Sequence, residues 1–273
     1  MTFELVPNLS EGRDRATIDA CVAAVEAAGA RVIHRTGDAA HHRSVLTILG
    51  EGAALVEAAV ALAEVAVARI DLREHRGVHP RIGALDVLPF VPLGDATLEA
   101  AAVLARNAAE RIWERCRVPS YYYGAASPTG RTLPSVRRGQ FEGLAGRADR
   151  PDVGAALHPS AGAIAVGARP ILIAFNVDLA TGDLAVAKEI ARVVRERDGG
   201  LRTLRALGLQ TGPGTVQVSL NVTMYHATPL YRVVETIRTL AAERDVTVLG
   251  SELIGCLPLD AVTTSADYYL GIA

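Results

Sequence analysis

Residues 171–222 decide the fold most clearly, and they read ILIAFNVDLATGDLAVAKEIARVVRERDGGLRTLRALGLQTGPGTVQVSLNV. The apolar run Ile171–Val177 predicts a strand. Apolar residues then recur at helical spacing over Asp183–Arg197, which predicts a helix with one buried face. Two further strands are expected at Leu204–Leu209 and Thr215–Val222. This order of strand, helix, strand and strand begins a ferredoxin-like βαββαβ unit.

The flanking sequence extends this pattern in both directions. A helix at Pro229–Glu243 and a strand at Thr247–Leu253 complete the unit. The N-terminal half shows the same order, without a detectable sequence repeat. We expect strands at Phe3–Val6, Arg31–His34, Ser44–Leu49 and Leu85–Val91, and helices at Asp14–Ala28 and Ala53–Arg69.

The middle of the chain departs from the βαββαβ order. A helix is expected at Thr97–Arg115 and a short aromatic strand at Tyr121–Gly124. Residues 125–163 are rich in Gly, Pro, Ser and Ala and predict a long loop with a short helix near Pro134–Phe141; such loops are often functional. We therefore expect an α/β (α+β) fold of two subdomains, residues 1–168 and 169–273, each a ferredoxin-like βαββαβ layer, with a ligand cleft between them.

Composition excludes several classes of protein. A net charge of −2 argues against a nucleic-acid binder, which usually carries a basic face. Cys21, Cys116 and Cys256 are widely spaced, so we expect a reduced cytoplasmic protein without disulfides or a zinc site. The sequence has no uncharged apolar run of 18 residues, so no membrane span is expected. The N-terminus shows no pattern of a signal peptide.

Two polar segments of the N-terminal half are candidate sites. Val6–Gly12 places Asn8, Ser10 and Glu11 between a strand and the positive end of a helix. The alternative is an ordinary capped turn. Asp38–Arg43 contains paired histidines, which suits either a metal site or a solvated loop. No third or fourth ligand is clearly spaced for a metal.

The third candidate is His79. His75 and His79 are four residues apart, as in a zinc-binding helix, but Gly77 and Pro80 disfavour a helix there. A loop histidine of this kind suits general acid–base chemistry near neutral pH. The neighbouring Arg76 and Arg81 are expected to lower its pKa. The alternative is a histidine with a purely structural role.

The fourth candidate is Gly154–Arg169, whose small residues allow a flat ligand to approach the backbone. It matches neither the GxxxxGK[ST] nor the GxGxxG nucleotide motif. The alternative is a flexible connector between the two subdomains.

Taken in order, these segments resemble the glutamate formiminotransferase family. The matching blocks span nearly the whole chain: Val6–Gly12, Gly77–Val87, Tyr123–Gly124, His158–Ala163, Gly167–Arg169, Ile173–Val177 and Gly250–Gly255. Each block is modestly specific, and the ordered set is highly specific.

The resemblance implies folate-dependent transfer of a formimino group between N-formimino-L-glutamate and tetrahydrofolate. It makes His79 the catalytic general acid/base. The expected substrate-binding residues are Asn8, Ser10, Asp38, Arg43, Arg81 and Tyr122, of which Tyr122 belongs to a tyrosine run expected near the pterin, with at least one ring in a buried strand. The expected folate contacts are Gly154, His158, Pro159, Ser160, Ala161 and Gly162.

The resemblance further implies a cytoplasmic homodimer in histidine degradation and one-carbon metabolism. Tetrahydrofolate is the co-substrate and no metal is expected. At 273 residues the chain is expected to be monofunctional, without the cyclodeaminase domain of the bifunctional enzymes. Ala40, His42 and Met224 replace an acidic residue, an asparagine and an aspartate of the family pattern. Two alternatives therefore stay open: a related transferase with another amino-acid partner, and a catalytically silent folate-binding relative.

Overall fold

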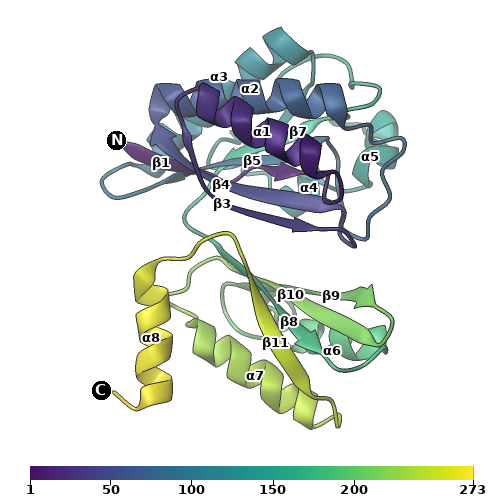
Figure 1. Cartoon of the computed structure of the whole chain (residues 1–273), viewed down its shortest axis with the longest axis vertical. Helices are drawn as coiled ribbons and strands as arrows, with labels where there is room; N and C mark the ends of the chain where they lie inside the picture. The colour runs from purple at the N-terminus through teal and green to yellow at the C-terminus, as the bar shows by residue number, and fades with distance from the viewer. Residues whose placement is uncertain (273) are drawn as a thin grey trace. The chain divides into compact units, whose positions relative to one another are not determined.

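The computed structural model describes residues 1–272 in two compact units, which meet in sequence at Pro170 and Ile171. Each unit is an α/β assembly with one sheet (Figure 1). The fold class expected from sequence is confirmed. None of the helices within residues 1–272 combines the length and apolar character needed to cross a bilayer.

The sheet of unit 1 has seven strands. They are β1 (Thr2–Leu5), β2 (Asn8–Leu9), β3 (Arg31–Asp38), β4 (Arg43–Glu51), β5 (Leu85–Pro92), β6 (Ser120–Gly124) and β7 (Ile164–Ala168). The order is β1-β4-β2-β5-β7-β6, with β3 on the outer side of β4. Both β1 and β2 pair with β4 and β5, so they form one strand interrupted near Pro7. Proline lacks the N–H of a regular strand residue, which fits the interruption.

The position of β7 corrects the sequence analysis. Ile164–Ala168 is no flexible connector, because it is a fully buried strand that pairs in parallel with both β5 and β6. The glycine of this strand is required there. A Cβ atom on Gly167 would lie 2.5 Å from a ring carbon of Tyr123.

Three helices cover one face of this sheet: α1 (Arg15–Ala27), α2 (Gly52–Arg69) and α3 (Leu98–Cys116) (Figure 1). Asp14 and Thr97 cap α1 and α3 by accepting from the N–H groups of Ala16 and Ala100. The segment expected as one short helix forms α4 (Leu133–Val136), α5 (Gln140–Gly143) and a 3-10 turn η1 (Leu144–Gly146). It packs on Ile82 and Tyr121 in a separate apolar cluster.

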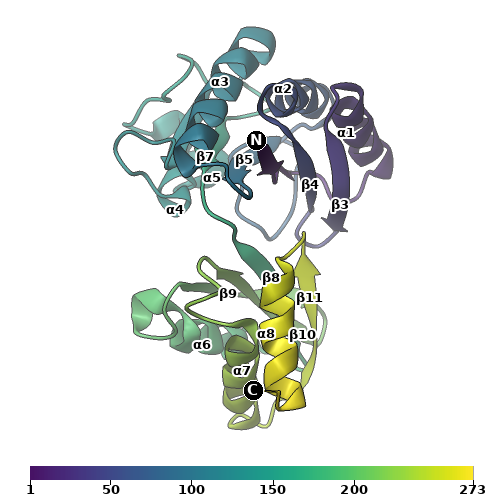
Figure 2. The same ribbon diagram turned by 90° about the vertical axis from the view of Figure 1, so that its left-hand side faces the viewer.

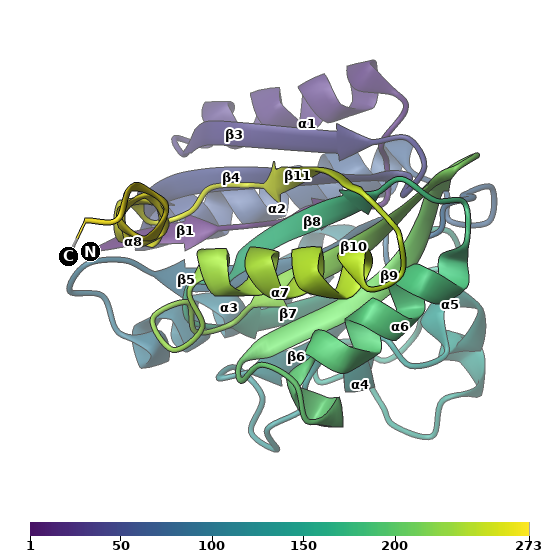
Figure 3. The same ribbon diagram turned by 90° about the horizontal axis from the view of Figure 1, so that it is seen from below.

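Unit 2 has the expected βαββαβ order. Its elements are β8 (Ile173–Leu179), α6 (Leu184–Val194), a 3-10 turn η2 (Glu196–Asp198), β9 (Leu204–Gly212), β10 (Thr215–Val222), α7 (Leu230–Ala242) and β11 (Val248–Ile254). The strand order β11-β8-β10-β9 is antiparallel throughout and is that of a ferredoxin-like sheet. Helices α6 and α7 lie across these strands (Figure 3). An additional helix, α8 (Leu259–Leu270), runs beside α7 (Figure 2).

Candidate functional site

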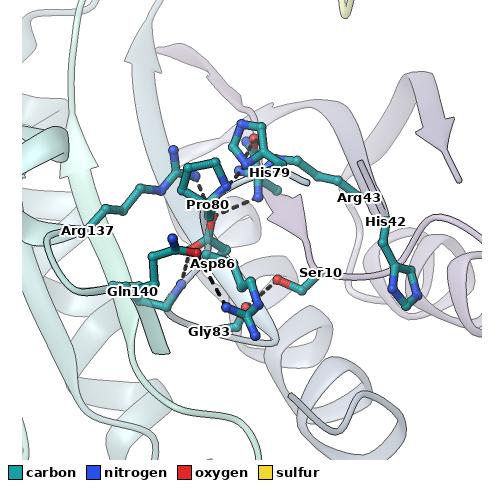
Figure 4. A network of polar contacts seen from close by, with 12 residues as sticks. Ser10, His42, Arg43, His79, Pro80, Gly83, Asp86, Arg137 and Gln140 are labelled. Carbon is teal, nitrogen blue, oxygen red and sulfur yellow. Dashed lines mark hydrogen bonds and ion pairs between the residues drawn. The ribbon is translucent and has the colours of Figure 1, made fainter. Parts of the chain in front are cut away.

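Asp86 is the centre of a buried polar network at the start of β5. Asn8 of β2 pairs with Val87 and Leu9 pairs with Leu85, so Asp86 is the extra residue of a β-bulge. A bulge redirects a side chain locally. Its carboxylate is fully buried and accepts hydrogen bonds from Nη1 of Arg43 (2.8 Å), from Arg137, and from the backbone N–H of Ile82 (2.8 Å). Figure 4 shows the two arginines converging on it.

The charges of this network fix the protonation of Asp86. Burial alone raises the pKa of a carboxyl group. Here the positive charges of Arg137 and Arg43, together with the Ile82 N–H, outweigh burial and lower the pKa of Asp86 to about 2. Asp86 is therefore a permanent carboxylate at neutral pH.

Arg43 is the second member of the network and is itself buried. Its Nε and Nη2 groups both donate to Oδ1 of Asn8, at 3.1 and 2.6 Å, and the Asn8 amide donates to the carbonyl of Val6 (2.8 Å). Burial lowers the pKa of Arg43 to about 10, with Asp86 opposing and Arg137 adding to the shift. Arg43 stays charged at neutral pH, and the two predicted residues Asn8 and Arg43 lie in contact.

His79 lies beside this network in the loop before β5 (Figure 4). Its Nδ1 atom is 2.8 Å from the carbonyl oxygen of Pro80, which can only accept a hydrogen bond. The proton therefore resides on Nδ1, and Nε2 carries the lone pair. Burial, followed by the charges of Arg43 and Arg137, holds the pKa of His79 well below 6.5. The expected direction is confirmed, but its predicted source was wrong, because neither Arg76 nor Arg81 is a main cause.

Arg81 points into a different set of contacts. Its Nε donates to Nδ1 of His75 (3.1 Å), and its two terminal nitrogens donate to Glu142 at 2.9 and 2.6 Å. His75 in turn donates from Nε2 to the carbonyl of His42 (2.9 Å) and stacks on the His42 ring at 4.2 Å. Arg81 is thus a buried residue that ties the His75 loop to α5.

The loop between β3 and β4 is folded against the site. Asp38 accepts from the backbone N–H of His41 (2.6 Å), and its carboxylate is 3.0 Å from Nδ1 of His41. Burial raises the pKa of Asp38, but the hydrogen bonds and the charge interaction with His41 outweigh burial, so the pKa is lowered. The rings of His41 and His79 are 6.1 Å apart. The loop is only partly solvated, because His41 is buried whereas Ala39 is exposed.

The predicted folate-binding turn adjoins the segment that follows His79. His158 and Gly162 exchange two backbone hydrogen bonds, and Nδ1 of His158 accepts from the Ala161 N–H (3.0 Å). The turn is held to residues 82–84 by backbone bonds from Ala84 N–H to the Ala161 carbonyl and from Ala163 N–H to the Ile82 carbonyl, both 3.0 Å.

Ser10 fastens the same segment from the other side. Its hydroxyl donates to the carbonyl of Gly83 (2.7 Å), and its N–H donates to the carbonyl of Ala84 (2.9 Å). The side chain is buried, so Ser10 positions the loop rather than presenting a hydroxyl to solvent.

Two residues that were predicted to contact substrate or folate, Tyr122 and Gly154, lie away from the His79 network. Tyr122 belongs to the core beneath the helices, whereas Tyr121 and Tyr123 belong to the cluster on the other face of the sheet, because side chains alternate along a strand. Burial raises the pKa of Tyr122 to about 12. Gly154 adopts a positive φ of 88° and packs on Trp113, where a Cβ atom would lie 2.6 Å from the ring.

Sequence reasoning missed Asp86 and Arg137. An isolated acidic residue in the apolar run Leu85–Val91 was the available signal for Asp86. No comparable signal marked Arg137, which is one of several arginines in a loop region. Within residues 1–272, no group of three or more His, Cys, Asp or Glu side chains is arranged to hold a metal ion.

Comparison with known families accounts for both units. The formiminotransferase domain, N-terminal subdomain, matches residues 2–169, and the formiminotransferase domain matches residues 174–272. The chain belongs to the formiminotransferase family. The formiminotransferase chain is therefore an enzyme of the transferase class.

The relatives of this formiminotransferase include glutamate formimidoyltransferases and formimidoyltransferase-cyclodeaminases. The glutamate formimidoyltransferase of Streptococcus pyogenes serotype M1 is 39% identical, with 98% of this chain and 93% of the relative covered. That of Thermoplasma acidophilum is 38% identical, with 98% and 91% covered. The formimidoyltransferase-cyclodeaminase of Rattus norvegicus is 35% identical over 97% of this chain but only 52% of its own length.

Proposed function

We propose that the chain transfers a formimino group between N-formimino-L-glutamate and tetrahydrofolate, with His79 as general acid and base. Family membership and the names of the full-length relatives support the reaction. The observation that carries the role of His79 is its neutral, oriented ring: Nδ1 is bonded to the Pro80 carbonyl, and the pKa lies well below 6.5. A histidine in this state is uncharged at neutral pH and has Nε2 available to take a proton as general base.

The reaction requires one proton to move between two nitrogens. The attacking amine forms a new C–N bond to the formimino carbon and must lose a proton. The bond to the amine that leaves then breaks, and that amine must gain a proton. In this proposal Nε2 of His79 takes the first proton and returns it to the leaving nitrogen, so the histidine ends unchanged. General acid–base catalysis of this kind contributes roughly 10²–10⁴-fold in rate.

Other residues have supporting parts in this proposal. Arg43 holds the buried Asp86 and is itself oriented by Asn8, and Ser10 fastens the loop that follows His79. Asp38 orients His41, whose ring lies 6.1 Å from that of His79. In this proposal these residues influence substrate binding indirectly, by setting the shape and charge of the site.

The turn His158–Gly162 is the proposed folate contact. His158 and Ser160 are only partly buried, while the backbone of the turn is firmly bonded to residues 82–84. A rigid backbone with accessible polar side chains suits the binding of a flat, polar ring system. The homodimer, the cytoplasmic location and the place in histidine degradation belong to the same proposal. The ligand cleft between the subdomains stays a prediction.

The test uses purified protein, tetrahydrofolate and N-formimino-glutamate, with formimino-tetrahydrofolate followed by chromatography. We expect turnover with the wild type and a loss of about 10²–10⁴-fold in His79→Gln, with tetrahydrofolate affinity retained. His34→Gln, a half-buried histidine on the edge strand β3, serves as the matched control and should turn over normally. Folate binding without turnover in the wild type would instead support a silent folate-binding protein.

A further inference from the structure

Three arginines surround the segment that carries His79, and in two of them every guanidinium nitrogen donates to the protein. Arg43 uses Nε and Nη2 on Asn8 and Nη1 on Asp86. Arg81 uses Nε on His75 and both terminal nitrogens on Glu142. All three nitrogens of each guanidinium therefore already donate to the protein, although both arginines were expected to bind the substrate.

Arg137 differs from both. Among residues 1–272 its guanidinium contacts Asp86 through one terminal nitrogen, and its Nε is buried without a hydrogen-bond partner. A guanidinium has five N–H donors, so most of those on Arg137 are not used by the protein. Its side chain is 16% exposed, compared with 9% for Arg43. Arg137 is therefore the more accessible of the two arginines on Asp86.

The backbone holds Arg137 in place. It is the C-cap residue of α4, with its N–H bonded to the carbonyl of Leu133 (3.0 Å). The other end of this short helix is closed by a capping box between Thr132 and Ser135. With its backbone fixed and its guanidinium paired to Asp86, the side chain loses little additional freedom when it binds a ligand.

The charges around Asp86 do not balance. Two guanidinium groups share one carboxylate, and His79 beside them is held neutral. The network therefore has one excess positive charge in a largely buried place. Such a charge is costly unless an anion pairs with it.

We propose that Arg137 binds a carboxylate of the amino-acid substrate beside His79. This inference rests on the proposed function and assigns to Arg137 a substrate contact that was expected of Arg43 and Arg81. The planar fork of an arginine matches a carboxylate in bidentate geometry. In N-formimino-glutamate the α-carboxylate and the reacting nitrogen share one carbon atom, so a group beside His79 can hold this carboxylate. The carboxylates of a folate lie at the far end of the molecule from N5.

The experiment compares Arg137→Ala and Arg137→Lys with Arg138→Ala. Arg138 is the next residue, has the same charge and is exposed. We expect KM for N-formimino-glutamate to rise about 10- to 100-fold in Arg137→Ala, as the loss of a charged hydrogen-bonded pair predicts. Arg137→Lys keeps the charge but not the fork and should lie between Arg137→Ala and the wild type. KM for tetrahydrofolate should stay unchanged, and Arg138→Ala should resemble the wild type.

A binding measurement separates this inference from the proposed reaction. Calorimetric titration with N-formyl-glutamate, which does not require turnover, should show the same 10- to 100-fold loss in Arg137→Ala. Equal affinity of the Arg137 and Arg138 variants for N-formyl-glutamate would overturn the inference, even if the wild type catalyses the transfer. A rise in KM for tetrahydrofolate, absent when tetrahydropteroate without the glutamate tail is used, would assign Arg137 to the folate instead. Thermal unfolding of each variant checks that it is folded.

Discussion

Asp86→Asn is the substitution that tests the buried network most directly. The change keeps the shape of the side chain but removes the charge shared by Arg43 and Arg137. Asp86 has a pKa of about 2 in the folded protein, compared with 3.8 for an ordinary aspartate. Because one pKa unit corresponds to about 1.4 kcal/mol, the ionised carboxylate contributes about 2 kcal/mol to stability at neutral pH.

The expected cost of the substitution is larger than this contribution. Two guanidinium groups would stay buried without a counter-charge, and removing one partner of a buried ion pair costs about 3–5 kcal/mol. The pH dependence has a definite sign. A lowered pKa means that the carboxylate stabilises the fold above about pH 4 and that this contribution is lost as the pH falls toward 2. Asp86→Asn should lack that part of the acid sensitivity.

The assay is urea unfolding followed by tryptophan fluorescence. Trp113 is the only tryptophan and lies in α3, so its emission reports on unit 1. Asp71→Asn is the matched control, because the pKa of Asp71 is also about 2. Its low value comes from hydrogen bonds with Arg73 at the surface, and exposed ion pairs contribute only about 0–1 kcal/mol. If the two variants lose the same stability, the reasoning from burial is refuted.

Three further predictions concern the site and its frame. The kcat/KM of the wild type should decline only below pH 6.5, because His79 stays neutral down to its lowered pKa; a decline centred above 6.5 would contradict this. Gly83→Ala should destabilise by about 1–3 kcal/mol or more in urea, since its Cβ would lie 2.1 Å from the carbonyl oxygen of Ala163, whereas Gly146→Ala, with open space, should stay within about 0.5 kcal/mol. Tyr122→Phe should leave both KM values near those of the wild type, because its ring lies in the core beneath the helices; a large rise in either value would restore it as a substrate-binding residue.

The regular elements could be predicted because they alternate apolar and polar residues at a clear period. The helix α6 and the strand β10 were expected within a few residues of their observed ends. The strand β7 was missed for a physical reason. Ile164–Ala168 is apolar throughout, and a strand buried on both faces has no alternation of polar and apolar residues to reveal it.

The site was only partly predictable, since it depends on contacts between distant segments. His79 was found from its local sequence, because Gly77 and Pro80 restrict its backbone. Its environment was not, because Arg43 and Arg137 reach it from β4 and from the end of α4. Arg76 and Arg81 were predicted to lower the pKa of His79 only because they are close to it in sequence.

The bulge at Asp86 has a consequence for how the family could change. Deleting one residue from a central strand normally turns every following side chain to the opposite face. Here the neighbours Val87 and Leu85 already face Asn8 and Leu9 as consecutive pairs would, so the loss of Asp86 alone would leave a regular strand with its apolar pattern intact. A single three-nucleotide deletion in a gene would thus keep the register of β5 with β2 while removing the carboxylate that pairs with Arg43 and Arg137.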